Sequence, residues 1–167
     1  MFDVLSRMVR TGILTEESVE ASRYGELQRD IYRILGRALC IRHVDAGSCN
    51  GCELELHALN NPCYNLEGRG IKFVASPRHA DLLLVTGPVS VNMEEALRRT
   101  WQAVPDPKLV VAIGDCAACG GVFGRSYATR GSVAEVIPVS HTIRGCPPAP
   151  SAILSGILEA LASASRV

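Results

Sequence analysis

Two short and nearly uninterrupted apolar runs constrain the fold of this 167-residue chain more than any other feature. They span Asp81–Thr86 and Leu109–Ile113, and each has the length of a strand rather than of a helix. A strand that is apolar on both faces is typical of a parallel sheet that is covered by helices on both sides. The two runs therefore predict an α/β fold with two buried neighbouring strands.

Strand and helix patterns alternate along the rest of the chain. Asn92 is a candidate N-cap, because Glu95 follows it three residues later as in a capping box. Further strands are expected at Cys40–Val44, Ile71–Val74 and Val136–Val139, and helices at 18–39, Glu53–Leu59, after Asn92 and from Ser151. This alternation predicts a flavodoxin-like, open and mainly parallel sheet with helices on both faces.

Charge and hydropathy exclude several classes of protein. Seventeen basic side chains balance seventeen acidic ones, so the chain lacks the positive charge that nucleic-acid binding requires. No apolar run approaches the ~18 residues of a membrane-spanning helix, and the N-terminus lacks the pattern of a secretory signal. We expect no nucleic-acid partner, and a cytoplasmic chain that is soluble or held at a membrane by partners.

Seven cysteines are the unusual part of the composition. An odd number without an export signal favours metal binding or redox chemistry over a disulfide framework. Five of them lie in loops after predicted strands, as Cys49 and Cys52, Cys116 and Cys119, and Cys146. Since the carboxyl ends of parallel strands meet at one edge of the sheet, these loops should converge there.

Two kinds of metal site are compatible with this spacing. A zinc ion would take the two Cys-x-x-Cys pairs, but 63 residues separate the pairs and Cys146 would have no role. A [4Fe–4S] cluster needs four thiolates, which scattered ligands on converging loops can supply. Glycines beside the cysteines would let the backbone approach the sulfides, namely Gly47, Gly51, Gly120, Gly121 and Gly145.

Four ordered blocks of sequence resemble one known family. They are Val44–Glu55, Ser76–Pro88, Gly114–Gly121 and Gly145–Pro148, and the resemblance covers roughly residues 25 to 162. The family comprises the 20 kDa, B-type subunit of respiratory NADH:quinone oxidoreductase and the small subunits of membrane-bound, energy-converting [NiFe] hydrogenases. Complex I subunits carry two adjacent cysteines in the first block, whereas the Cys-Asn-Gly-Cys-Glu of this chain resembles the hydrogenase branch, which includes formate hydrogenlyase.

The resemblance implies a site, a function and partners. It implies one [4Fe–4S] cluster on Cys49, Cys52, Cys116 and Cys146, with Cys40, Cys63 and Cys119 outside the ligand set. The chain would then pass electrons between ferredoxin-like iron–sulfur subunits and the active site of a hydrogenase large subunit. The alternatives are the equivalent subunit of a complex I-type enzyme, with a quinone pocket in the large subunit, and a zinc-stapled binding domain. Integral membrane subunits would hold it, as a peripheral protein, at the cytoplasmic face of the inner membrane.

Three further expectations concern parts of the chain near these blocks. Glu53 either complements the N-terminus of its helix or, as the resemblance favours, transfers protons at the interface with the large subunit. Arg144 either places positive charge near a reduced cluster or forms a surface salt bridge. Residues 1–22 are expected to form an arm that contacts a partner or the membrane subunits, and residues 23–167 to form one cluster-binding domain.

Overall fold

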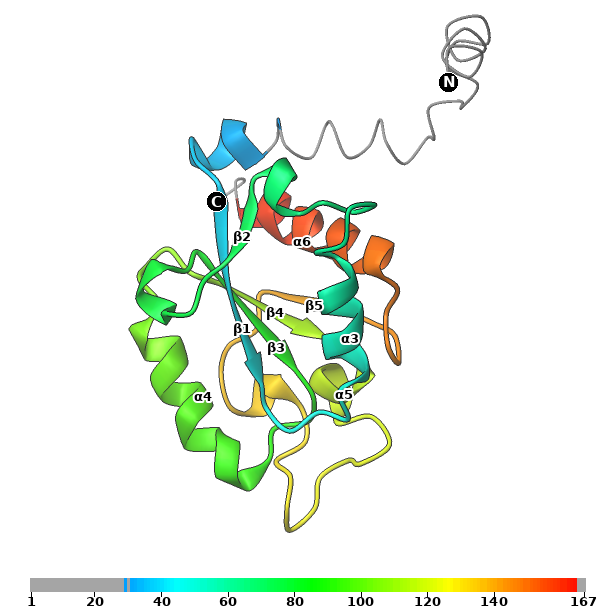
Figure 1. Ribbon diagram of the computed structural model, residues 1–167. Helices are drawn as coiled ribbons and strands as arrows, with labels where there is room; N and C mark the ends of the chain where they lie inside the picture. Colours follow the sequence, from blue (N-terminus) through cyan, green and yellow to red (C-terminus); the bar gives the residue numbers. More distant parts are fainter. Residues whose placement is uncertain (1–28, 30, 165–167) are drawn as a thin grey trace, which may run out of the picture.

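A five-stranded sheet forms the centre of the computed structural model, which describes residues 29 and 31–164 (Figure 1). All neighbouring strands are parallel, and their order is β2-β1-β3-β4-β5. The strands are β1 (Leu39–Asp45), β2 (Ile71–Phe73), β3 (Leu82–Thr86), β4 (Leu109–Ile113) and β5 (His141–Ile143). This order, with the chain reversing direction across the sheet between β1 and β3, confirms the flavodoxin-like α/β fold.

Helices cover both faces of the sheet, as the continuous apolar runs predict. Figure 1 shows α4 on one face and the pair α3 and α6 on the other. The helices are α3 (Gly51–Ala58), α4 (Val91–Ala103), α5 (Gly114–Cys119) and α6 (Pro150–Ala164), with 3₁₀ turns η1 (Glu67–Arg69), η2 (Pro77–His79) and η3 (Val133–Glu135). Every residue of β3 is buried, so this strand separates two apolar layers.

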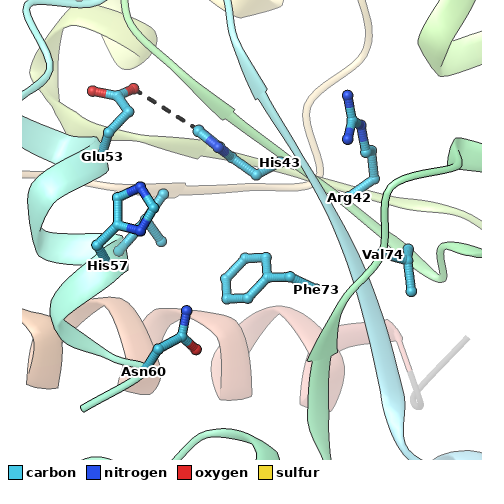
Figure 2. Close-up of a pocket in the computed structure, with 8 residues that line it drawn as sticks. Arg42, His43, Glu53, His57, Asn60, Phe73 and Val74 are labelled. Atoms are coloured by element: carbon cyan, nitrogen blue, oxygen red, sulfur yellow. Dashed lines mark ion pairs between the residues drawn. The ribbon is translucent and has the colours of Figure 1, made fainter.

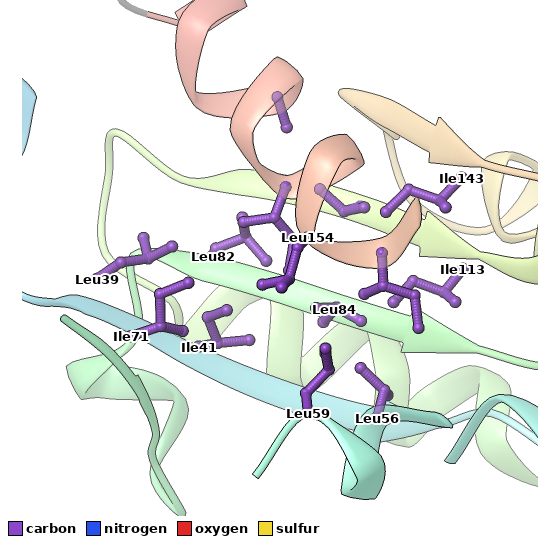
Figure 3. Close-up of a cluster of buried hydrophobic side chains, with 14 of the residues drawn as sticks. Leu39, Ile41, Leu56, Leu59, Ile71, Leu82, Leu84, Ile113, Ile143 and Leu154 are labelled. Carbon is purple, nitrogen blue, oxygen red and sulfur yellow. The ribbon is translucent and has the colours of Figure 1, made fainter. Parts of the chain in front are cut away.

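Each apolar layer is built from alternate residues of the strands. Ile41, Leu84 and Ile113 point toward α3 and α6, where they contact Leu56 and Leu154 in one cluster (Figure 3). The intervening residues, such as Leu83 and Val85, join Leu97 of α4 in the second cluster. Burial of each such side chain contributes about 1.5–3 kcal/mol, which makes the sheet a rigid support for the loops at its edge.

The register of the strands aligns their carboxyl ends in one row. Asp45 pairs with Thr86, Thr86 with Ile113, and Ile113 with Ile143. Asp45, Ile113 and Ile143 end β1, β4 and β5, and the segments after these three strands contain the candidate cysteines. The register therefore confirms that the cysteine-bearing loops leave the sheet at the same edge.

Two local expectations, a strand and a helix cap, differ from the structure. No strand forms at Val136–Val139, because Pro138 has no N–H to donate and pairing begins only where Ser140 N–H donates to Val110 O at 2.8 Å. The cap of α4 is Ser90, whose hydroxyl accepts from Met93 N–H at 3.3 Å, so Asn92 lies inside the helix.

The helix expected at 18–39 ends earlier than its periodicity predicts. Helical structure stops at residue 35, because Gly36 adopts a positive φ of 65° and Leu39 begins β1. The remainder of the expected 18–39 helix up to residue 28, the 1–22 arm and the first residues of the 23–167 domain lie outside the described residues. Within residues 29 and 31–164, no helix is both long enough and apolar enough to span a bilayer.

Candidate functional site

The loop between β1 and α3 positions the first pair of cysteines. Its turn is held by the carboxylate of Asp45, which accepts from Gly47 N–H at 2.8 Å and from Ser48 N–H at 2.7 Å. The chain then passes through Cys49 and enters α3, which places Cys52 in the first helical turn, where it is buried.

The other cysteine-bearing segments follow β4 and its neighbour β5, the last strand of the sheet. The backbone of β4 runs directly into α5, so Cys116 lies in the first turn after the strand. Cys146 follows β5 by three residues, and it is exposed. Asp115 N–H donates to Gly145 O at 2.9 Å, which ties the segment before Cys116 to the segment before Cys146.

Four of the thiols interact electrostatically with one another. Burial, followed by the negative charges of Glu53, Cys116, Cys49 and Cys146, raises the pKa of Cys52 to about 12. Burial also raises the pKa of Cys116, with Cys146, Cys49 and Asp115 acting in the same direction. The structure thus brings together Cys49, Cys52, Cys116 and Cys146, the four that the resemblance implied as ligands.

Glycines line the sulfur atoms of this group. A Cβ on Gly114 would lie 2.7 Å from Cys52 Sγ, and one on Gly121 would lie 2.7 Å from Cys116 Sγ. Both glycines have positive φ angles, 86° and 54°. These side-chain-free positions let backbone approach the sulfurs. Gly121 is one of the glycines expected from the sequence, and Gly114 is an addition from the structure. Across the described ranges, no three His, Cys, Asp or Glu side chains form a group suited to a single metal ion.

The other cysteines take different places. Cys119 is exposed, and its thiol donates to Asp115 O at 3.2 Å while Arg144 Nη1 lies 3.5 Å from its sulfur. Cys63 is exposed in the segment after α3, and Cys40 is half-buried in β1.

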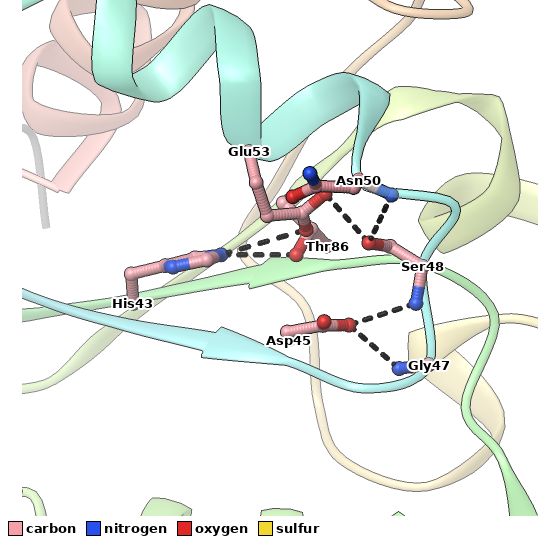
Figure 4. Close-up of polar contacts among 7 residues, drawn as sticks. All are labelled: His43, Asp45, Gly47, Ser48, Asn50, Glu53 and Thr86. Carbon is pink, nitrogen blue, oxygen red and sulfur yellow. Dashed lines mark hydrogen bonds and ion pairs between the residues drawn. The ribbon is translucent and has the colours of Figure 1, made fainter.

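Glu53 belongs to a buried polar network behind the thiols (Figure 4). Its side chain is only 8% exposed, and Ser48 Oγ donates to its Oε2 at 2.6 Å. Its Oε1 lies 3.8 Å from His43 Nε2 and has no hydrogen-bond partner. Glu53 also lies in the first turn of α3, where a carboxylate complements the positive end of the helix.

His43 connects this network to the neighbouring strand. Its Nε2 lies 2.9 Å from Thr86 Oγ1, and burial lowers its pKa more than the carboxylates of Glu53 and Asp45 raise it. The ring is therefore neutral near pH 7 and can exchange a proton. Sequence patterns gave His43 no role; the one available signal is that Thr86 ends an otherwise apolar strand with a hydroxyl.

A cavity of about 240 Å³ lies beside the network (Figure 2). Polar, aromatic and aliphatic side chains line it, namely Arg42, His43, Glu53, Leu56, His57, Asn60, Phe73 and Val74. The Nε of Arg42 is buried there without a hydrogen-bond partner. The buried carboxylate of Glu53 therefore borders a polar space that is large enough to hold water.

Comparisons with known proteins find relatives over most of the chain. The family model described as "NADH ubiquinone oxidoreductase, 20 Kd subunit" matches residues 49–160. The "probable membrane-bound hydrogenase subunit mbhJ" of Pyrococcus furiosus is 42% identical over 148 residues, which cover 89% of each chain. Formate hydrogenlyase subunit 7 of Escherichia coli is 38% identical over 161 residues, which cover 96% of this chain and 63% of that protein.

A solved structure shares the fold over most of the chain. It is a chain of the membrane-bound sulfane sulfur reductase, described as an archaeal respiratory membrane complex. The TM-score is 0.69 and the identity 32%, over 84% of this chain and 77% of that one. The Pyrococcus furiosus protein and the sulfane sulfur reductase are named as parts of membrane-bound complexes.

Proposed function

This chain belongs to the family of the 20 kDa subunit of NADH:ubiquinone oxidoreductase, and we propose that it is the electron-transfer subunit of a membrane-bound [NiFe] hydrogenase. In this proposal it holds one [4Fe–4S] cluster and relays electrons between ferredoxin-like iron–sulfur subunits and the active site of the large subunit. The observation that supports it best is the convergence of four thiols from three segments at one sheet edge.

The residues present fit such a cluster. Cys49, Cys52, Cys116 and Cys146 would be its ligands, and the bound cluster would supply reversible one-electron storage. The raised pKa values of Cys52 and Cys116 keep these thiols protonated until iron compensates the charge of four thiolates. Cluster loading is therefore expected to release protons and to become more favourable as the pH rises.

The large subunit decides between the two redox functions. The Cys-x-x-Cys spacing of the first pair and the similarity to mbhJ favour a hydrogenase over a quinone-reducing complex I-type enzyme. We propose that integral membrane subunits hold the chain as a peripheral protein at the cytoplasmic face of the inner membrane. Residues 1–22, outside the described residues, remain a proposed contact with those subunits.

Anaerobic purification of the full chain tests the cofactor. We expect about four iron and four sulfide per chain, and an EPR signal of a [4Fe–4S]⁺ cluster after reduction. A colourless protein with stoichiometric zinc would overturn the proposal in favour of a zinc-stapled domain. A co-purified large subunit that lacks nickel-binding cysteines would instead favour the complex I-type function.

Substitution of Gly114 by alanine tests the fit of the backbone to the ligands. The new Cβ would lie 2.7 Å from Cys52 Sγ. A free thiol can rotate away, but a ligated sulfur cannot, so we expect Gly114→Ala to lower bound iron several-fold. Gly124→Ala is the matched control, because its φ is also positive, 55°, but no atom lies within 4 Å of the added Cβ. Equal iron content in the two variants would contradict the proposed position of the cluster.

We also propose a role for Glu53, that of a proton carrier beside the cluster. Its burial, its unpaired Oε1 and the neighbouring polar cavity support this role. A carboxylate in this position can take up a proton when an electron arrives, because the proton neutralises the added charge in a poorly solvated site. His43, 3.8 Å away, is the neighbouring group able to exchange that proton.

A further inference from the structure

Two reciprocal hydrogen bonds join the segments that precede Cys116 and Cys146. Asp115 N–H donates to Gly145 O at 2.9 Å, and Gly145 N–H donates to Asp115 Oδ1 at 3.3 Å. We call this pair of bonds the Asp115–Gly145 clasp. Each of its residues immediately precedes a proposed cluster ligand, so the clasp sets the spacing between two of the four ligands.

The clasp also holds a positive charge. Nη1 of Arg144 lies 3.7 Å from the Oδ1 that accepts the Gly145 bond, and 3.5 Å from Cys119 Sγ. Cys119 is itself bonded to the backbone oxygen of Asp115. The guanidinium is therefore kept over the ligand-bearing helix α5 by two neighbouring contacts.

Stability does not explain this ion pair. The side chains of Arg144 and Asp115 are 64% and 39% exposed, and ion pairs this exposed add little to the free energy of unfolding. Their position next to two proposed ligands gives them an electrostatic effect on the site. Addition of one electron makes the site more negative, so a fixed cation nearby favours the reduced form and a fixed anion opposes it.

The charges that act on the buried thiols make a cation relevant here. Beside the other thiols, the carboxylate of Glu53 raises the pKa of Cys52 and the carboxylate of Asp115 raises that of Cys116. His43, the neighbour of Glu53, has a lowered pKa and supplies no positive charge near pH 7. Arg144 is a cation that contacts Asp115 and Cys119 directly, next to two proposed ligands.

We propose that Arg144 and Asp115 are opposed positioning charges that set the reduction potential of the cluster. Arg144 stabilises the reduced form, Asp115 stabilises the oxidised form, and the clasp holds both charges at a constant distance from the ligands. This inference rests on the proposed function, because it requires a redox cluster on the four cysteines.

Redox titration of the full chain, purified anaerobically with its co-purifying subunits and monitored by EPR, tests the inference. Arg144→Gln should lower the potential, so that the ratio of reduced to oxidised cluster at a fixed poise falls about three- to tenfold. Asp115→Asn keeps an acceptor for Gly145 N–H but removes the charge, and should raise that ratio by a similar factor. The double variant should return close to the wild-type potential.

Matched controls separate charge from structure. Arg99→Gln removes an exposed arginine that is paired with Glu95 on α4, away from the ligand segments, and should leave the potential unchanged. The opposite shifts of the reduction potential in Arg144→Gln and Asp115→Asn should also become smaller as the salt concentration is raised above about 0.1 M, where the screening length is about 10 Å. A purely mechanical clasp would show neither the opposite signs nor the salt dependence.

The outcomes distinguish this inference from the proposed function. Full iron content with equal potentials, or with shifts of the same sign, overturns the role of the two charges and leaves the cluster proposal intact. Absence of a cluster from the wild-type chain overturns the proposed function itself. If Asp115→Asn loses iron, the shift of Arg144→Gln relative to Arg99→Gln decides the question alone.

Discussion

Replacement of Cys146 by alanine is expected to remove the [4Fe–4S] signal from the chain and at least about nine-tenths of its bound iron. Cys146 comes from the segment after β5, the last strand of the sheet, whereas Cys49 and Cys52 come from the segment after β1, which two strands separate from β5. Its thiolate acts on both Cys52 and Cys116, which places it in the same group of sulfurs. With three thiolates left, one iron of the cluster has no protein ligand and becomes open to solvent and oxidation.

Cys119→Ala is the matched control for this experiment. Cys119 is as close to Cys116 in sequence as Cys49 is to Cys52, but its thiol bonds to Asp115 O on its own helix. Cys63→Ala removes another exposed cysteine from a segment that contains no proposed ligand. Both variants should retain iron, sulfide and the EPR signal. Loss of metal from Cys119→Ala but not from Cys146→Ala would instead identify the two Cys-x-x-Cys pairs as ligands of a zinc-type site.

The sequence predicted the inner strands β3 and β4 better than the outermost strand β5. Leu82–Thr86 and Leu109–Ile113 are apolar on both faces because helices cover both sides, and their apolar runs are unambiguous. The edge strand β5 contains His141 and Thr142, whose polar side chains do not distinguish a strand from a loop. The sequence instead predicts a strand at the more apolar Val136–Val139, where a single proline is the sign against pairing with β4.

The convergence of the cysteine-bearing segments was predictable because the strands decide it. Once the strands are parallel, the segments after β1, β4 and β5 must leave from one edge, whatever their own conformation. The polar surroundings of that site were not predictable. His43 and Thr86 are 43 residues apart, and Asp115 and Gly145 are 30 apart, so their contacts depend on strand register and side-chain rotamers.

Glu53→Gln is expected to reduce turnover of the assembled complex by about 100-fold or more, since a positioned proton carrier contributes about that factor. The glutamine keeps the size of the side chain and an oxygen that accepts from Ser48 Oγ, 2.6 Å away in the wild type. It cannot take up a proton, so the part of the pH–rate profile that depends on the carboxylate should disappear. Iron content and the EPR spectrum should stay unchanged, which separates proton transfer from damage to the cluster.

The neighbours of Glu53 provide two checks on this interpretation. Glu55→Gln removes a carboxylate from the same helix, outside the buried network, and should leave turnover and the pH profile unchanged. The negative charge of Glu53 raises the pKa of His43 against the effect of burial, so Glu53→Gln should lower that pKa further, as measured by NMR titration. A lowered His43 pKa with wild-type turnover and pH dependence would leave Glu53 as a structural member of the network, because its charge would reach His43 without serving proton transfer.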